Sequence, residues 1–329
     1  MWFQTLMGFQ EKNPDQVRSN CGVEGDKLVS LVNGKQYTFG SLETPSLADL
    51  RSQSKRLDIG PGKIHLSERV ADVQELHMDP KNAHALFQVA SQFNLLEMLG
   101  PNRTPEEGVG IYSFDRTQGP ACAIAAGAGT IYRNYFVEVN GTIGQRVDKQ
   151  IDCLADLGAL LGNHEQRIWN MQNGYVLPSG EGLKEVAKKL KGMGEEERDI
   201  LRSALRIGLQ WSTEVTLMNP GHLVSQAYCS ALPVAYSSLP AESWANFAQL
   251  ILEAAYEATL HAGLINLSTT GNPKVFLTLL GGGAFGNRDS WIFSAIRRAI
   301  TLFKNFPLEV VFVSYGSSNS KLNEFILGS

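Results

Sequence analysis

Hydrophobic and polar positions form their most regular pattern toward the carboxyl end of the chain. Residues 274–280 and 308–315 are mostly apolar runs, which predict two buried strands. Between them, Asp289–Phe303 repeats apolar residues every three or four positions and predicts an amphipathic helix. A glycine-rich loop at 281–287 joins the first strand to this helix. The order strand, helix, strand predicts parallel pairing in a layered α/β domain.

The rest of the chain alternates between strand-like and helical patterns. A hairpin is expected at 27–39, and strand-like stretches are expected at 70–76, 86–93, 168–176 and 223–236. Helices are expected at 46–53, 119–135, 151–161, 182–207 with a break near 192–194, 240–262 and 321–327.

A cluster of Gly and Pro at 58–63 marks the expected domain boundary. Residues 1–60 contain too few large apolar side chains for a core of their own. They are therefore predicted to be an N-terminal extension packed on the main domain, which spans 61–329.

Composition narrows the class of protein. The 329 residues are 43% hydrophobic and 19% charged, which is typical of a globular domain. The net charge of −4 argues against a general nucleic-acid binder, and no apolar run is long enough to cross a bilayer. The absence of a secretory pattern favours a cytoplasmic location.

Cysteines and histidines give no sign of a metal site. The four cysteines are Cys21, Cys122, Cys153 and Cys229, far apart and without zinc spacing, and the six histidines are scattered. We expect reduced, buried thiols and no protein-built metal centre.

The glycine loop has the spacing of a phosphate site. Gly281, Gly283 and Gly286 match G-x-G-x-x-G between a strand and a helix, where backbone N–H groups face an anion. A tight turn without a ligand is the alternative. Too little chain follows for a dinucleotide-binding fold, and the acidic residue expected after the next strand is missing. No Gly-Lys-Ser/Thr occurs, so a Walker loop is excluded.

The position of this loop resembles the second phosphate loop of macrodomains, which wraps the diphosphate and distal ribose of ADP-ribose. The resemblance implies ligand contacts from Gly282, Gly283, Ala284, Phe285, Gly286 and Asn287. From the residues alone, Phe285 could equally fill the core and Asn287 could cap the following helix. Further upstream, Ala71-Asp72-Val73 is similar to the adenine-binding element, and 87–94 is similar to the strand that ends in a ribose-contacting Asn, here Asn94.

Six segments together resemble a divergent subgroup, the MavL-like macrodomain (ADP-ribosyl)hydrolases, which act on mono-ADP-ribosylated arginine. They are the glycine loop, 87–98, 115–123, 130–136, 211–216 and 224–236. The resemblance implies an α/β fold with a three-layer, macrodomain-like mixed sheet flanked by helices. It also implies hydrolysis at the anomeric carbon of the distal ribose, with no cofactor. The implied partners are ADP-ribose and a mono-ADP-ribosylated protein.

Catalytic carboxylates are expected at Glu214 and Asp115. Glu214 lies among Trp211, Thr213 and Val215 in a strand-like stretch, and a carboxylate can pair with the guanidinium of the leaving arginine or orient water. Asp115 precedes Gln118-Gly119, which suits the first phosphate loop at a helix start. Alternatives are a surface Glu214, a turn or cap at Asp115 and an ordinary helix start at Gln118.

Other readings stay open from the sequence. Glu253 and Glu257, four apart on one helix, are either an acid–base pair or a solvated stripe. His222 and His261 are expected to be structural. The same pocket could belong to a module that binds ADP-ribose and cuts nothing, or to an enzyme that uses NAD.

Overall fold

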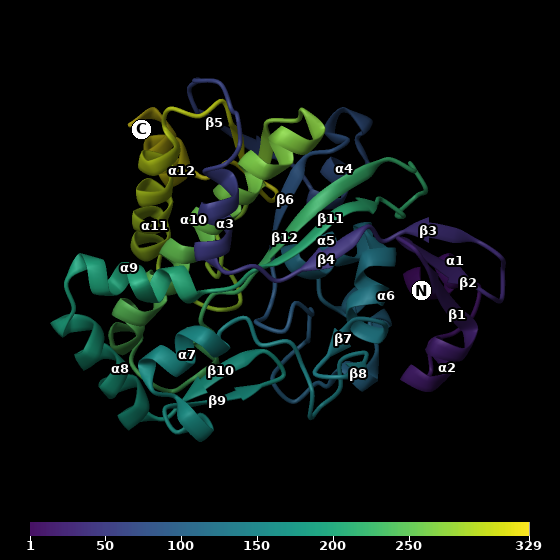
Figure 1. The fold of residues 1–329 in the computed structure, drawn as a ribbon, viewed down its shortest axis with the longest axis horizontal. Helices are drawn as coiled ribbons and strands as arrows, with labels where there is room; N and C mark the ends of the chain where they lie inside the picture. Colours follow the sequence, from purple (N-terminus) through teal and green to yellow (C-terminus); the bar gives the residue numbers. More distant parts are fainter. Residues whose placement is uncertain (329) are drawn as a thin grey trace.

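A seven-stranded mixed sheet forms the centre of the computed structural model, which describes residues 1–328 (Figure 1). Strands β12, β6, β13, β14 and β5 pair in parallel, and β11 runs antiparallel to both of its neighbours. In spatial order the strands are β4 (Ser41–Glu43), β11 (Gly208–Glu214), β12 (Leu223–Cys229), β6 (Leu86–Ala90), β13 (Lys274–Leu277), β14 (Glu309–Ser314) and β5 (His65–Val70).

Three small antiparallel sheets lie outside the central one. They are β1 (Cys21–Glu24) with β2 (Lys27–Ser30) and β3 (Gln36–Thr38), β7 (Glu138–Val139) with β8 (Thr142–Ile143), and β9 (Trp169–Gln172) with β10 (Tyr175–Pro178).

Helices cover both faces of the central sheet. The α-helices are α1 (Trp2–Met7), α2 (Pro14–Asn20), α3 (Leu47–Ser54), α4 (Val73–Met78), α5 (Gln118–Ala125), α6 (Gly127–Tyr135), α7 (Ala155–Leu161), α8 (Gly180–Gly192), α9 (Glu195–Ala204), α10 (Ala245–Thr270), α11 (Asp289–Phe303) and α12 (Ser320–Leu327). The short 3-10 turns are η1 (Pro80–Asn82), η2 (Pro105–Glu107), η3 (Gly110–Phe114), η4 (His164–Gln166), η5 (Val234–Tyr236) and η6 (Ala241–Trp244).

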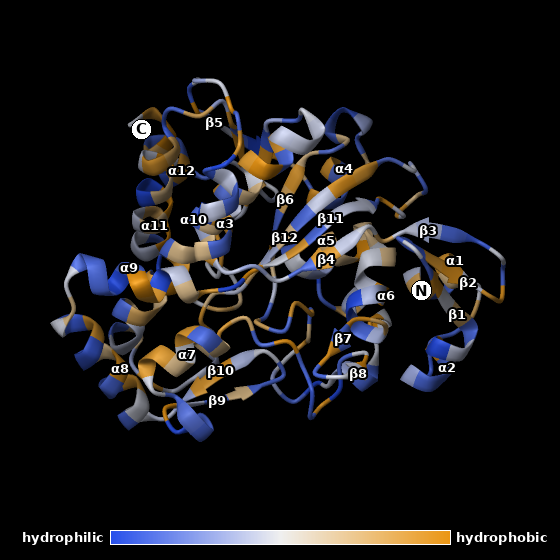
Figure 2. Cartoon of the chain, viewed as in Figure 1, coloured by the Kyte–Doolittle hydropathy of each residue, from blue (hydrophilic) through white to orange (hydrophobic). Residues whose placement is uncertain are grey.

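Neighbouring residues of β6 show how the layers are separated. Phe87 stacks on His77 of α4, whereas the amide of Gln88 donates to Thr259 of α10 at 3.0 Å. Since successive strand residues point to opposite faces, α4 and α10 lie on opposite sides of the sheet. Orange and blue residues alternate along helices such as α8 and α9, as expected for helices with one buried face (Figure 2). The expected fold class, a mixed sheet flanked by helices in three layers, is confirmed.

The carboxyl-terminal pattern is confirmed in order and in pairing. Strand β13, the glycine loop, α11 and β14 follow one another, and β13 and β14 pair in parallel. The expected break in the long charged helical stretch is also confirmed, because α8 ends at Gly192 and α9 starts at Glu195.

Two expected elements are wrong. Residues 70–76 are not a strand: β5 ends at Val70, and Asp72 then caps α4 by accepting from the Gln74 N–H at 2.8 Å. Their apolar residues follow helical spacing, since Val73 and Leu76 are buried three positions apart. The helix expected at 119–135 is two helices, which are separated by a non-helical Ala126.

The N-terminal region is in two parts. The first part packs Phe3, Leu6 and Met7 against Ile131 and Tyr135 of α6 in a second hydrophobic core. The second part enters the main layers, because β4 pairs with β11 and α3 packs on α10. The sheet and the helical layer therefore both include residues from before the expected boundary near residue 60.

Candidate functional site

Three neighbouring parallel strands end at the same edge of the sheet, and the segments that follow them lie along this edge. Strands β12, β6 and β13 continue into 230–236, 91–98 and 278–288. Backbone hydrogen bonds join them: Ser91 N–H donates to the Cys229 carbonyl at 2.9 Å, and Ala235 N–H donates to the Phe285 carbonyl at 3.0 Å. In open α/β sheets this edge, at the carboxyl ends of the strands, is where ligands bind.

The segment after β6 is held in a strained conformation by several hydrogen bonds. Leu95 has a φ of 64°, a left-handed value that side chains other than glycine rarely adopt. Its carbonyl accepts from Nε of the buried Arg133 at 3.1 Å. The side chain of Gln92 accepts from the Met98 N–H at 2.7 Å. Such strain persists only where the surroundings fix it, and it is frequent at functional sites.

Glu97 is the one carboxylate of this segment, and it is buried. Its side chain is 2% exposed, and its Oε1 has no hydrogen-bond partner within residues 1–328. Burial raises the pKa of Glu97 to about 8. The nearby Arg133 and a hydrogen bond from Ser91 oppose the shift, and the charge of Asp115 adds to it. The Glu97 N–H donates to the Tyr112 hydroxyl at 3.1 Å. A buried carboxyl group with a raised pKa and a free oxygen is typical of catalytic acids.

The start of α5 lies against this carboxylate. A Cβ at Gly119 would lie 2.0 Å from the Ala90 carbonyl oxygen and 2.3 Å from Glu97 Oε2, so only glycine fits there. The side-chain amide of the neighbouring Gln118 is hydrogen-bonded to β6. Its Oε1 accepts from the Ala90 N–H at 2.8 Å, and its Nε2 donates to the Gln88 carbonyl at 2.7 Å. Gly119 therefore brings the helix start to Glu97, while Gln118 fixes that start to the sheet.

Three aromatic rings connect Glu97 to the glycine loop. Tyr175, Tyr236 and Phe285 contact one another with ring centroids 5.1 to 5.6 Å apart. The Tyr175 hydroxyl donates to the carbonyl of Met98, the residue after Glu97, at 2.8 Å. Phe285 packs against both hydrophobic cores, in agreement with the core-filling alternative, and it also joins the loop to the aromatic cluster.

The glycine loop is anchored at its ends and open in its middle. Gly281 and Gly286 have φ values of 75° and 68°, which favour glycine. The Asn287 amide donates to the Leu232 carbonyl at 2.8 Å. Asn287 is buried, and the residue that caps α11 is Arg288, so the alternative of Asn287 as a helix cap is wrong. Gly282, Gly283 and Ala284 are exposed and free for a ligand.

Several predicted site residues lie along this edge. Asp72 and Val73 follow β5 at the start of α4, with Val73 buried and Asp72 half-buried. Asp115 follows η3, accepts from the Thr117 N–H at 2.8 Å and interacts electrostatically with Glu97. Gly119 therefore approaches Glu97 directly, Asp115 interacts with it electrostatically, and the glycine loop is linked to its neighbour Met98 through the aromatic cluster.

Two predicted residues need correction. Glu214 is at the end of β11, paired with Leu223 at the start of β12, so it lies at the edge of the sheet opposite to the glycine loop. There its Oε2 accepts from the Thr38 N–H at 2.9 Å. Asn94 is fully buried, and its side chain bonds to Gln150 at 2.8 Å and to the Leu96 N–H at 3.1 Å. Asn94 shapes the loop and presents no surface to a ligand.

Sequence reasoning missed Glu97, Tyr175 and Tyr236 as site residues. A signal for Glu97 was present, because it is the single charged residue between His84 and Arg103. A lone charge inside an apolar run is the pattern of a buried ionisable group. Tyr175 and Tyr236 reach the site only through the packing of distant segments.

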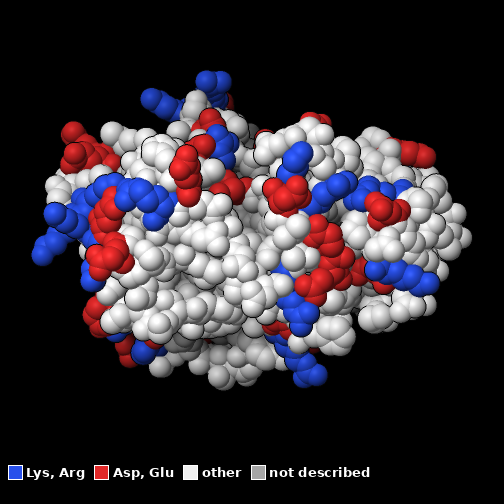
Figure 3. Space-filling model, turned by 90° about the horizontal axis from the view of Figure 1, so that it is seen from below, with Lys and Arg blue, Asp and Glu red and all other residues white. Residues whose placement is uncertain are grey.

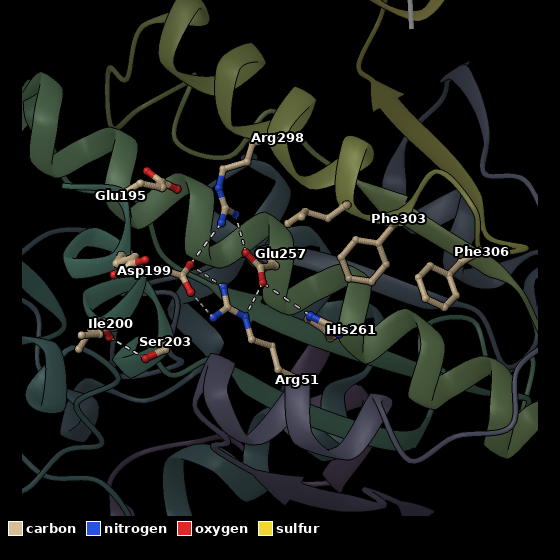
Figure 4. A pocket seen from close by; sticks show the side chains of 12 residues that line it. Arg51, Glu195, Asp199, Ile200, Ser203, Glu257, His261, Arg298, Phe303 and Phe306 are labelled. Carbon is tan, nitrogen blue, oxygen red and sulfur yellow. Dashed lines mark hydrogen bonds and ion pairs between the residues drawn. The ribbon is translucent and has the colours of Figure 1, made fainter.

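A cavity of about 720 Å³ lies away from this edge, among α3, α9, α10 and α11 (Figure 4). Its charged side chains point toward one another. Buried Glu257 accepts from Arg51 Nε at 2.6 Å and from Arg298 Nη1 at 2.5 Å, and Asp199 accepts from Arg51 at 2.7 Å. We interpret this cluster as a structural ion-pair network.

Both expectations for the Glu253 and Glu257 pair are therefore wrong. Glu253 accepts from Arg202 Nε at 2.7 Å, so neither residue is part of a solvated stripe or of an acid–base pair. His261 lies beside Ser54 at 2.7 Å, and His222 lies beside the His77 carbonyl at 2.8 Å, in agreement with structural roles.

The surface gives no separate basic patch on the face seen from below, where Lys and Arg alternate with Asp and Glu (Figure 3). Within residues 1–328, no group of three or more His, Cys, Asp or Glu side chains is placed to hold a metal ion. In the same part of the chain no helix has the length and apolarity to cross a membrane. The four cysteines are buried and unpaired with one another.

Comparisons with known proteins found similar structures but no match to the sequence. No family model matches the chain, and no curated protein matches its sequence. Among solved structures, it is similar to the poly(ADP-ribose) glycohydrolase of Thermomonospora curvata, with 10% identity, 95% and 94% of the two chains covered and a TM-score of 0.46. It is also similar to the Deinococcus radiodurans enzyme in complex with ADP-ribose, with 9% identity, 87% and 91% covered and a TM-score of 0.46.

Proposed function

We propose that this protein is a hydrolase that binds ADP-ribose and removes mono-ADP-ribose from modified arginine side chains. The observation that carries the proposal is Glu97, a buried carboxyl group with one free oxygen, placed between the start of α5 and the aromatic cluster of the glycine loop. Selectivity for arginine rests on the resemblance of the chain segments to the MavL-like subgroup.

The ligand is proposed to lie along the carboxyl ends of the strands. The exposed backbone of 283–284 and the helix start at Gly119 offer N–H groups to the diphosphate. Phe285 and Tyr236 offer ring faces to the distal ribose, and Asp72 offers a carboxylate to the adenine amino group. This arrangement brings the anomeric carbon of the distal ribose toward Glu97.

The chemistry then needs two proton transfers. With a pKa of about 8, Glu97 is protonated at neutral pH and donates its proton to the leaving guanidine nitrogen as the C–N bond breaks. The oxygen of water bonds to the anomeric carbon, and the Asp115 carboxylate takes the proton of that water. Asp115 then passes this proton to Glu97, which returns both carboxyl groups to their starting protonation states. Water and substrate are thereby converted to ADP-ribose and unmodified arginine.

Binding and linkage can be tested in one series. Purified protein is incubated with peptides mono-ADP-ribosylated on arginine, serine or glutamate and with poly(ADP-ribose), and released ADP-ribose is measured by mass spectrometry. Release from the arginine peptide alone supports the full proposal, whereas release from another linkage overturns the arginine selectivity. Binding of ADP-ribose without any release would identify a binding module instead.

The Gly283→Glu variant should lose affinity for ADP-ribose by about tenfold or more, because it places a negative charge where the diphosphate binds. A Cβ at Gly283 meets no atom within 4 Å, so the variant should fold normally. Calorimetric titration with ADP-ribose measures the change. Gly192→Glu is the matched control, because Gly192 is also open and lies on the distant α8. Equal affinity in the two variants would contradict the placement of the diphosphate.

A further inference from the structure

A carboxylate from the N-terminal region is inserted beneath the site. Glu11 lies between α1 and α2, and its Oε1 accepts from the Val109 N–H at 3.0 Å and from the Tyr135 hydroxyl at 2.8 Å. Its Oε2 accepts from the Gly110 N–H at 2.6 Å. Burial raises the pKa of Glu11, and these three hydrogen bonds oppose that shift.

The chain around Glu11 is shaped for this carboxylate. A Cβ at Gly108 would lie 2.7 Å from the Glu11 carboxyl carbon, and a Cβ at Gly110 would lie 2.6 Å from its Oε2. Gly108 also has a φ of 89°, which favours glycine. Two glycines thus admit the carboxylate to the N–H groups of Val109 and Gly110 at the start of η3.

The segment that Glu11 holds leads directly to the catalytic group. Tyr112 in η3 is fully buried, and its hydroxyl accepts the Glu97 N–H at 3.1 Å. The Asp115 N–H donates to the Tyr112 carbonyl at 3.1 Å. A displacement of η3 would therefore move the supports of Glu97 and Asp115 together.

We infer that Glu11 is a positioning residue, through which residues at the start of the chain hold η3, and with it Glu97 and Asp115, in the productive arrangement. The inference rests on the proposed function, because it assigns Glu11 to the same site. A misplacement of about 1 Å costs up to about 100-fold in rate, so the rate of the chemical step should respond to Glu11.

The test is Glu11→Gln in the full chain. The glutamine amide places an N–H donor where a carboxylate oxygen accepted a hydrogen bond, so at least one of the donors of Val109, Gly110 and Tyr135 loses its acceptor. The kcat for the ADP-ribosylated peptide should fall about 10- to 100-fold, while KM changes less than about threefold. Tyr112→Phe should also lower kcat, and the double variant should be no slower than the slower single variant, because both act through one support. If Glu11→Gln does not fold, Glu11→Asp, which keeps the charge and shortens the reach, takes its place.

Asp49→Asn is the matched control. Asp49 is another N-terminal carboxylate that accepts a backbone N–H, from Ser46 at 2.9 Å, but it caps α3 away from η3. Its kcat should be unchanged. An equal fall of kcat in both variants, or a rise of KM without a fall of kcat, would overturn the inference.

Hydrogen exchange separates this inference from the proposed function. If Glu11 holds η3, then Glu11→Gln should speed exchange in peptides covering 108–116 and 95–98, whether or not the protein has the proposed activity. Faster exchange confined to the first 20 residues would overturn the role of Glu11. If Glu11→Gln shows the expected faster exchange in 108–116 and 95–98, but the wild-type protein releases no ADP-ribose, the proposed activity alone is overturned.

Discussion

Glu97→Gln should lower the release of ADP-ribose by about 10²- to 10⁴-fold and leave the affinity for ADP-ribose nearly unchanged. Glutamine keeps the size of the side chain, but it cannot donate a carboxyl proton to the leaving nitrogen. No hydrogen bond joins the Glu97 side chain to the aromatic cluster or to the glycine loop within residues 1–328, so both should keep their arrangement. Turnover of the modified peptide and titration with ADP-ribose measure the two quantities separately.

The pH dependence gives an independent check. Burial raises the pKa of Glu97 from 4.5 to about 8, so between these values the folded protein binds a proton that the unfolded chain does not. The stability that this proton contributes is fully present below about pH 4.5 and is lost as pH rises through about 8. Glu97→Gln should remove this loss, and wild-type turnover should fall above about pH 8. Turnover in Glu97→Gln at the wild-type rate would exclude Glu97 as the acid.

Glu214→Gln is the matched control for Glu97→Gln. Glu214 is also a carboxylate at the end of an ordered segment, but it lies at the opposite edge of the sheet. Its replacement should leave turnover unchanged. A large loss of turnover in Glu214→Gln alone would contradict the site described above.

Glu257→Gln should lower the free energy of unfolding by about 1–3 kcal/mol, because Arg51 and Arg298 lose their buried partner but keep Asp199. Burial alone would raise the pKa of Glu257, but hydrogen bonds from His261, Arg51 and Arg298 hold it well below its usual range. Urea unfolding at neutral pH measures the loss. Turnover of the folded variant should be unchanged, since the network shares no residue with the site.

Glu253→Gln provides the comparison for this network. Glu253 is more exposed than Glu257, and its partner Arg202 keeps Glu195 at 2.9 Å and Asp199 at 3.1 Å. The loss should therefore be about 1 kcal/mol. A loss of turnover in Glu257→Gln with unchanged stability would identify the charged cavity as a functional site and contradict its structural role.

Local patterns in the sequence were sufficient for the carboxyl-terminal half of the site. The glycine loop follows an apolar strand and precedes an amphipathic helix. The strand is recognised by its short apolar run, and the helix by apolar residues at every third or fourth position. The loop also requires left-handed glycines at Gly281 and Gly286, which the sequence spacing already contains. Element type and order could therefore be predicted there without knowledge of the tertiary structure.

The carboxylate that we propose as catalytic could not be chosen in the same way. Glu214 has strand-like neighbours, but the antiparallel direction of β11 places it at the wrong edge, and strand direction is not visible in a local pattern. Asn94 is polar and follows a buried strand, yet Gln150 and Leu96 occupy its side chain. Glu97 stands out in the sequence as a lone charge, but its contacts with Arg133 and Gly119, which are distant in sequence, are visible only in the structure.

The most direct test of the central claim is the release of ADP-ribose from an arginine-modified peptide by the wild-type protein and by Glu97→Gln under the same conditions. We predict release by the wild-type protein and a loss of about 10²-fold or more in the variant, with ADP-ribose binding retained in both. No release by a wild-type protein that binds ADP-ribose, or equal release by the two proteins, would contradict the assignment of this edge of the sheet as a hydrolytic site.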